Sequence, residues 1–262
     1  LICRPGLAPA GAGSPMDWPL AARFDEMDAM VVFDDVLVPW ERFFIFRDID
    51  ACNAVYRKSF GVTHMAQQFV TKDLAKAEFM MGIAFAVART AKVDEFLHVQ
   101  GMLTELINMT ETVRACLVAA EAGASETPFG TTMPDRWPLE AMRFNFPDMF
   151  RRACEIIQTI GAGGLMMVPS AADLSGPLSE DVTRYAQAAN ADAADRIRLF
   201  RLAVAASTSG FSGRQQLYER YFAGDPVRAA GILYKQYETA AYRDRIEAFL
   251  DVSEQAVQPR PD

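Results

Sequence analysis

Residues 94–124 decide the fold class, and they read DEFLHVQGMLTELINMTETVRACLVAAEAGA. Apolar side chains and one threonine recur there at steps of three and four residues, at Val99, Met102, Leu103, Leu106, Thr110, Val113 and Leu117. That spacing places them on one stripe of an α-helix. Gly123 and the turn-forming residues 125–130 then break the pattern. The sequence therefore predicts one long helix over 94–124 with a single apolar face.

Further helices are predicted on both sides of this stretch. Residues 72–91 are rich in Ala, Met, Phe and Lys and contain no proline. A helix is expected over 142–160, with Pro147 as a difficulty near its start and Gly161–Gly164 as its end. Others are expected at 189–209, 215–221, 226–237 and 241–253, with Asp225 and Pro226 starting the third of these. Long helices joined by short loops favour an antiparallel bundle, so the chain is predicted to be mainly α.

The first 50 residues have a different character. The β-rich runs are Leu1–Arg4, Met30–Phe33 and Val36–Val38, and the Pro/Gly/Ala-rich residues 5–19 predict a loop. This is too little sheet to close a core, because a stable sheet needs more strands or a packing partner. The chain also begins with Leu rather than Met, so we expect a fragment of a longer protein.

The composition limits the possible partners. The chain has 262 residues, of which 51% are hydrophobic and 23% charged, which is typical of a folded domain with a sizeable core. With 26 Lys and Arg against 34 Asp and Glu, the net charge is −8, which argues against a nucleic-acid or anionic-membrane partner. The most apolar run, 79–91, contains Arg89 and is shorter than the roughly 20 residues needed to span a bilayer. The 4 cysteines form no CxxC pair, which favours a reducing, cytoplasmic setting.

Two places could contact a small ligand. The chain has only 2 histidines, so a His-rich metal site is not expected. His98 is interpreted as a partly exposed or capping residue, whereas His64 either faces a ligand cavity or bonds a backbone carbonyl. Gly161-Ala162-Gly163-Gly164 is no dinucleotide fingerprint. It is either a helix C-cap or a place where bare main-chain N–H groups approach an anion such as a pyrophosphate.

Several blocks of sequence carry a family resemblance. They are PMDWPL at 15–20, RFDEMDA at 23–29, FDDVLVPWER at 33–42, HVQ at 98–100, residues 158–165, and GRQQLYER at 213–220 leading into GDP at 224–226. In this order they resemble the flavin-dependent 4-hydroxyphenylacetate 3-hydroxylase family (oxygenase component). The resemblance covers nearly the whole chain.

The resemblance implies an acyl-CoA dehydrogenase-like fold. Such proteins have an N-terminal helical domain, a middle β-domain and a C-terminal four-helix bundle that builds a homotetramer. Residues 1–45 would then be the end of the β-domain, and residues 46–262 the helical bundle.

The resemblance also implies a reaction. A separate flavin reductase supplies FADH2, which forms a C4a-hydroperoxide with O2, and the distal oxygen is placed ortho to the hydroxyl of a phenol. The implied cofactor contacts are Gln158, Gly161, Ala162, Gly163 and Gly164, and His64 is the candidate for the substrate. No catalytic residue is named, because the main phenol-polarising and flavin-gripping residues of the family are expected largely in the absent N-terminal portion. We therefore expect the 262-residue chain alone to be catalytically inactive.

Two alternatives stay open. The chain could serve only as an inactive oligomerisation bundle, or it could belong to another acyl-CoA dehydrogenase-like enzyme such as a dehydratase. The related 4-hydroxybutyryl-CoA dehydratases hold an iron–sulfur cluster with a His and a downstream Cys in this region. Here His64 is followed by Gln67, Gln68 and Thr71, with no Cys before Cys116, which argues against a cluster.

Overall fold

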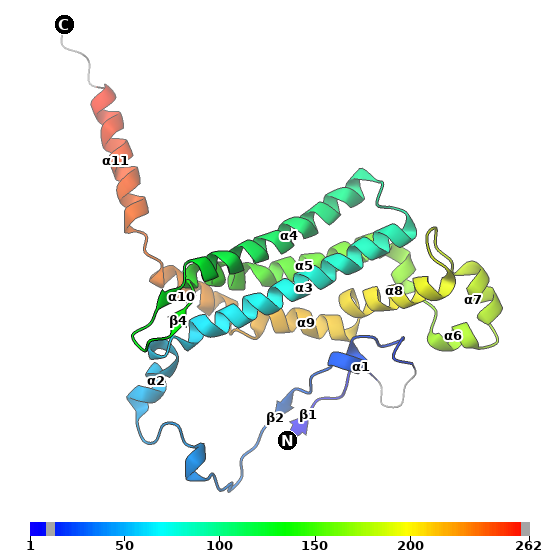
Figure 1. The fold of residues 1–262 in the computed structure, drawn as a ribbon, viewed down its shortest axis with the longest axis horizontal. Coiled ribbons are helices and arrows are strands. Elements are labelled where there is room, and N and C mark those ends of the chain that lie inside the picture. The colour runs from blue at the N-terminus through cyan, green and yellow to red at the C-terminus, as the bar shows by residue number, and fades with distance from the viewer. Residues whose placement is uncertain (9–13, 258–262) are drawn as a thin grey trace. The chain divides into compact units, whose positions relative to one another are not determined.

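Four helices pack against one another and form the core of the fold (Figure 1). The computed structural model describes residues 1–8 and 14–257, with side chains as far as residue 251. The bundle consists of α3 (Gly61–Ala91), α4 (Leu97–Ala122), α5 (Arg136–Met166) and α8 (Ala193–Ser207). Both α3 and α5 contact each of the other members. The predicted mainly α fold with a four-helix bundle is confirmed.

Short links set the directions of these helices. Residues 92–96 join α3 to α4, and Lys92 ends α3 in the left-handed conformation with φ 56°. A small antiparallel hairpin of β3 (Ser125–Glu126) and β4 (Thr132–Met133) joins α4 to α5 and contains Gly130 with φ 72°. Because short links reverse the chain, α3 and α5 run parallel and α4 runs antiparallel to both.

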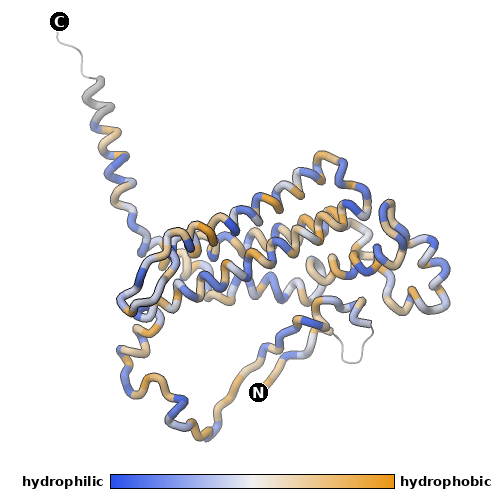
Figure 2. The backbone as a smooth tube through the Cα atoms, viewed as in Figure 1, coloured by the Kyte–Doolittle hydropathy of each residue, from blue (hydrophilic) through white to orange (hydrophobic). Residues whose placement is uncertain are grey.

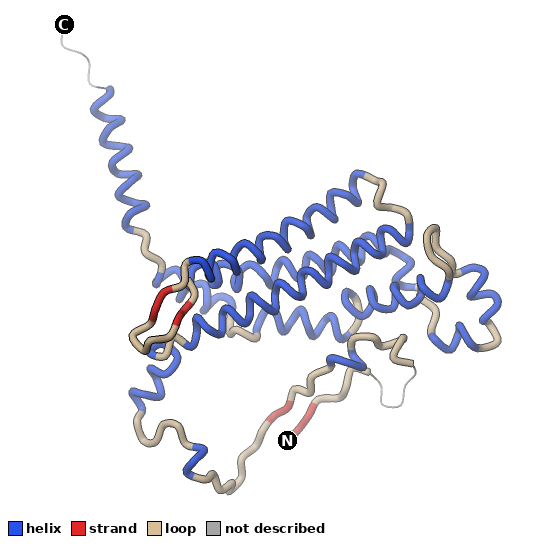
Figure 3. Tube along the Cα trace, in the orientation of Figure 1, coloured by secondary structure: helices blue, strands red, loops and turns tan. Residues whose placement is uncertain are grey.

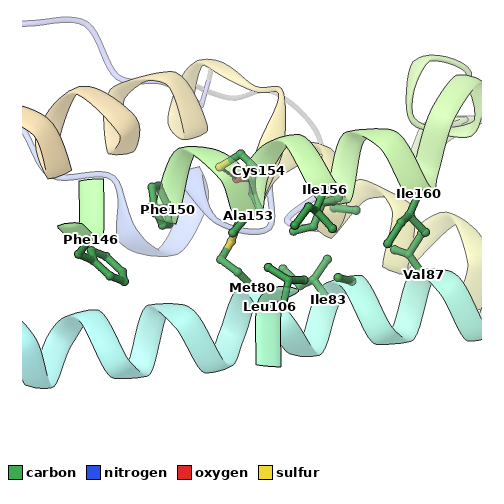
Figure 4. Close-up of a cluster of buried hydrophobic side chains, with 14 of the residues drawn as sticks. Met80, Ile83, Val87, Leu106, Phe146, Phe150, Ala153, Cys154, Ile156 and Ile160 are labelled. Atoms are coloured by element: carbon green, nitrogen blue, oxygen red, sulfur yellow. Dashed lines mark hydrogen bonds between the residues drawn. The ribbon is translucent and has the colours of Figure 1, made fainter. Parts of the chain in front are cut away.

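The core lies where α3, α4 and α5 meet (Figure 4). Each buried aliphatic or aromatic side chain stabilises a fold by about 1.5–3 kcal/mol, so this shared core dominates the stability of the bundle. The predicted stripe on α4 is confirmed, since Val99, Leu103, Leu106, Thr110 and Val113 are all buried. Facing residues include Met80, Ile83 and Val87 of α3 and Phe146, Phe150, Ile156 and Ile160 of α5.

Two helices extend further than their sequences predict. α3 begins at Gly61 instead of residue 72, because Thr63, Ala66 and Val70 are buried at helical spacing among polar neighbours. α5 begins at Arg136, where the Asp135 carboxylate caps it, and passes through Pro147. The buried rings of Phe146 and Phe150 hold it to the core on either side of that proline. The predicted end of the regular helix at Gly161–Gly164 is confirmed, because Ala162 is non-helical there, and helical residues resume beyond this kink as far as Met166.

The N-terminal segment forms less sheet than predicted. β1 (Ile2–Cys3) pairs antiparallel with β2 (Ala29–Met30), and α1 (Ala21–Phe24) lies between them in sequence. The predicted strand at 36–38 is wrong, because the segment pairs with no strand of the described chain and Leu37 is 92% exposed. Figure 2 shows the apolar character of this segment, which continues through a 3-10 helix, η1 (Trp40–Arg42), to α2 (Ile49–Lys58).

The remaining elements are short helices (Figure 3). α6 (Ala171–Ser175) and α7 (Ser179–Tyr185), which the sequence did not predict, separate α5 from α8, and α9 (Gly210–Tyr221) follows. Residues 1–222 form one unit, and α10 (Pro226–Gln236) and α11 (Ala240–Val257) belong to a second. The predicted start of α10 is confirmed, since the Asp225 carboxylate accepts a hydrogen bond from the Arg228 N–H. Residues 9–13 of the predicted loop, and 258–262, lie outside the described residues.

Candidate functional site

The sequence Gly161-Ala162-Gly163-Gly164 forms a kink inside α5, whose C-cap is Met167. Ala162 has φ 44° and ψ −140°, a conformation that residues other than glycine rarely adopt. Such backbone strain costs of order 1–3 kcal/mol and clusters at functional sites. The kink interrupts the regular helix as the cap interpretation predicts, and contact of its main chain with a ligand stays a prediction. Ala162 and Gly163 are exposed, so the main chain at the kink is accessible.

The glycines of the kink have different structural roles. A Cβ on Gly161 would lie 2.6 Å from Cγ of Leu165, and a Cβ on Gly164 would lie 2.8 Å from Cε1 of Phe200. At Gly163 the only close atom outside the adjacent backbone is Cε of Met167, at 3.9 Å. Packing within this chain therefore explains why residues 161 and 164 are glycine, but it does not explain the glycine at 163.

Gln158 precedes the kink and ties α5 to the end of α8. Its Nε2 donates a hydrogen bond to the carbonyl oxygen of Ser207 at 2.6 Å. The predicted cofactor residues therefore lie together at one end of the bundle, where Ile160 packs near Val87 close to the end of α3 (Figure 4).

His64 lies at the opposite end. It is half-buried in the first turn of α3 and lines an open depression of about 680 Å³ with Phe129, Thr131 and residues of α2. From His64 to the end of α3 the helix rises by about 40 Å at 1.5 Å per residue. The structure thus places His64 beside a cavity, but within one chain it does not bring His64 near the kink.

Sequence reasoning missed a buried charge cluster between α3 and α9. Glu219 is 2% exposed, its Oε2 lies 2.5 Å from Nζ of Lys72, and its Oε1 pairs with Nζ of Lys76. Oδ1 of the buried Asp73 lies 2.8 Å from Nζ of Lys72. In the sequence, only Glu219 in the block LYER and the spacing of Lys72 and Lys76 by one helical turn could have indicated this cluster.

Burial controls the electrostatics of this charge cluster. It raises the pKa of the Asp73 carboxyl to about 7, with Lys72 acting in the opposite direction. Burial also lowers the pKa of the Lys76 ammonium. The lysine heads lie over aromatic rings, Lys72 at 4.4 Å from the centroid of Phe222 and Lys76 at 5.1 Å from that of Tyr218. The cluster therefore fixes α9 on α3.

A second ion network joins two of the blocks that carry the family resemblance. Nε and Nη2 of Arg214 donate to the two carboxylate oxygens of Asp28 at 2.7 and 2.8 Å. Nε of Arg4 donates to the same carboxylate at 3.0 Å. Hydrogen bonds from Arg214 and Arg4 lower the pKa of Asp28. The acidic block at 23–29 and the block at 213–220 thus form one structural unit.

Comparison with known proteins places this fold in a class and then in a family. A crystal structure of an archaeal 4-hydroxybutyryl-CoA dehydratase from N. maritimus has a TM-score of 0.81 at 16% identity, covering 92% of this chain and 48% of that chain. The two chains therefore share one helical-bundle fold. The family model "4-hydroxyphenylacetate 3-hydroxylase C terminal" matches residues 52–251, and its N-terminal counterpart matches residues 1–45. The chain belongs to the 4-hydroxyphenylacetate 3-hydroxylase family.

Relatives in this family agree with the assignment. A 4-hydroxyphenylacetate 3-monooxygenase oxygenase component from Thermus thermophilus is 43% identical over 252 residues, which is 96% of this chain and 52% of the relative. A Geobacillus protein of the same name is 39% identical, over 90% of this chain and 48% of its own length. A crystal structure of such a component complexed with FAD and 4-hydroxyphenylacetate has a TM-score of 0.91 at 42% identity, covering 98% of this chain and 53% of that chain. The chain spans about half the length of the curated relatives it matches.

Two features are absent from residues 1–8 and 14–257. None of their helices is both long and apolar enough to cross a bilayer. The same residues contain no group of three or more His, Cys, Asp or Glu side chains able to hold a metal ion.

Proposed function

We propose that this chain is the C-terminal part of the oxygenase component of a two-component, FADH2-dependent phenol monooxygenase. Family membership carries this proposal, supported by the relative whose crystal structure is described as a complex with FAD and 4-hydroxyphenylacetate. In the proposal, residues 1–45 end the middle β-domain and residues 46–262 form the helical bundle domain. Bound FADH2 and O2 supply the oxygen atom that is added ortho to the phenol hydroxyl. A separate reductase delivers FADH2, in a cytoplasmic setting.

The kink in α5 fits a dinucleotide cofactor. Packing within this chain does not explain why residue 163 has no side chain, so its main chain is open to a ligand. The neighbouring Ala162 has a strained backbone conformation. Backbone N–H groups without a covering side chain are suited to binding anionic phosphates. Gln158 and the residues from Gly161 to Gly164 would therefore bind FAD and exclude water beside it.

The separation of His64 from the kink favours more than one copy of the chain. His64 lies in the first turn of α3, about 40 Å at 1.5 Å per residue from the far end of that helix, and the kink in α5 lies close to that far end. We propose that the kink contacts a flavin held mainly by a neighbouring copy in a homotetramer. His64 would face the phenolic substrate of a different site through the largely apolar depression that it lines with Phe129.

Substitution of Gly163 by valine tests the cofactor role of the kink. We expect Gly163→Val to raise the Kd for FAD at least tenfold and to change the unfolding free energy by less than about 1 kcal/mol, because the site is open. Gly164→Ala is the matched control, which should lose stability because its Cβ would meet Phe200 at 2.8 Å. An unchanged FAD affinity of Gly163→Val together with a large loss of stability would favour a purely structural role.

Two assays separate the alternatives. Supplied with reductase, NADH and FAD, the 262-residue chain alone should form little or no catechol, because the main phenol-polarising residues are expected outside it. Robust hydroxylation would contradict this. Stoichiometric iron and acid-labile sulfide would instead favour a dehydratase. The chain has no Cys between His64 and Cys116, and the Thr71 hydroxyl is used in a hydrogen bond to the carbonyl of Gln67 at 2.8 Å.

A further inference from the structure

Arg196 of α8 lies directly beside the kink in α5. Its Nη2 is 3.4 Å from the position that a Cβ on Gly164 would occupy. Its guanidinium carbon lies 4.8 Å from the ring centroid of Phe200, and its Nη1 donates to the carbonyl oxygen of Ala186 at 3.3 Å. The lack of a side chain at Gly164 therefore leaves room for the ring of Phe200 and the guanidinium of Arg196. The guanidinium is positioned by the Phe200 ring and by its hydrogen bond to Ala186.

The charge of Arg196 has no carboxylate partner within 4.0 Å among the residues that the structure describes. The other arginines of α8 differ in this respect. Arg198 pairs with Asp195 at 3.7 Å, and Arg201 pairs with Asp17 at 3.5 Å. A positive charge without a counter-ion thus stands next to strained, accessible main chain.

We propose that Arg196 binds the diphosphate of the flavin dinucleotide that docks on the kink. This inference rests on the proposed function and adds a residue on a second helix to the proposed cofactor site. A guanidinium offers several N–H donors in one plane and recognises phosphate oxygens by charge-assisted hydrogen bonds. Because the contact is to the diphosphate, Arg196 distinguishes FAD from flavins that lack it.

Titration of the full-length protein with FAD and with riboflavin tests this role. Arg196→Gln should raise the Kd for FAD about tenfold, as expected for loss of one charge-assisted hydrogen bond, and leave the Kd for riboflavin unchanged. Arg196→Lys should recover part of the FAD affinity, and the salt dependence of FAD binding should weaken in Arg196→Gln. The control Arg198→Gln, on the same helix and paired with Asp195, should bind both flavins like the wild type.

The outcomes separate this inference from the proposed function. If Gly163→Val weakens FAD binding but Arg196→Gln does not, the role of Arg196 is wrong and the proposed cofactor site stands. If Arg196→Gln weakens FAD and riboflavin equally and lowers the Tm, Arg196 is structural and the inference is overturned. If the full-length wild-type protein binds neither flavin, the proposed cofactor site and the role of Arg196 both fail.

Discussion

Substitution of Glu219 by glutamine should loosen α9 from α3. Glu219 is 2% exposed and pairs with both Lys72 and Lys76, so the change removes a shared counter-charge while keeping the shape of the side chain. Breaking a fully buried ion pair costs about 3–5 kcal/mol. The side chains of Lys72 and Lys76 are 27% and 26% exposed, so water compensates in part and we expect a loss of about 2–3 kcal/mol.

Urea unfolding followed by circular dichroism measures this loss. The control is Glu111→Gln, because Glu111 is 60% exposed and pairs with Arg114 at 3.2 Å, and such a surface pair contributes less than about 1 kcal/mol. Adding Lys76→Met to Glu219→Gln should cost less than the sum of the single changes, since the two groups interact. Equal stability of Glu219→Gln and Glu111→Gln would refute the reasoning.

Two further predictions concern Asp73 and Ala162. Burial raises the pKa of the Asp73 carboxyl to about 7, well above the usual value of about 3.9 for aspartate, so the folded state holds a proton that the unfolded state releases. The contribution of Asp73 to the unfolding free energy is therefore complete below about pH 4 and falls by up to about 1.4 kcal/mol per pH unit until pH 7. Urea midpoints measured from pH 5 to 8 should fall with pH in the wild type, and this fall should be absent in Asp73→Asn. Ala162→Gly should stabilise the fold by about 1 kcal/mol, because relief of 1–3 kcal/mol of strain exceeds the entropy that glycine adds to the unfolded chain; an unchanged or lower Tm would contradict the strained geometry.

Local patterns predicted most of the bundle. The stripe from Val99 to Val113 identified α4 because one helix face meets the core, and the Asp225 cap identified the start of α10. The start of α3 could not be found in this way, since Thr63, Ala66 and Val70 become a core face only once α4 and α5 cover them. The apolar residues at 36–38 look like a strand, but a strand needs a partner that the described chain does not provide.

The candidate site depended more strongly on tertiary structure. The block 161–164 was recognisable from its glycines, but the strained backbone of Ala162 and the close packing of Leu165 and Phe200 against Gly161 and Gly164 appear only in the folded chain. The charge cluster joins Lys72 to Glu219 across 147 residues of sequence, a distance that no local pattern reports. Likewise, no local pattern predicts that Arg196 of α8 lies beside Gly164, because only the packing of α8 on α5 brings the two together.

Amide hydrogen exchange with and without FAD tests the central claim most directly, namely that the kink in α5 meets the flavin cofactor. We predict that FAD slows exchange in a peptide covering residues 158–167, with the largest effect at Ala162 and Gly163, and leaves the core of α4 around Leu106 unchanged. Saturating FAD binding with unaltered exchange throughout 158–167 would contradict the claim.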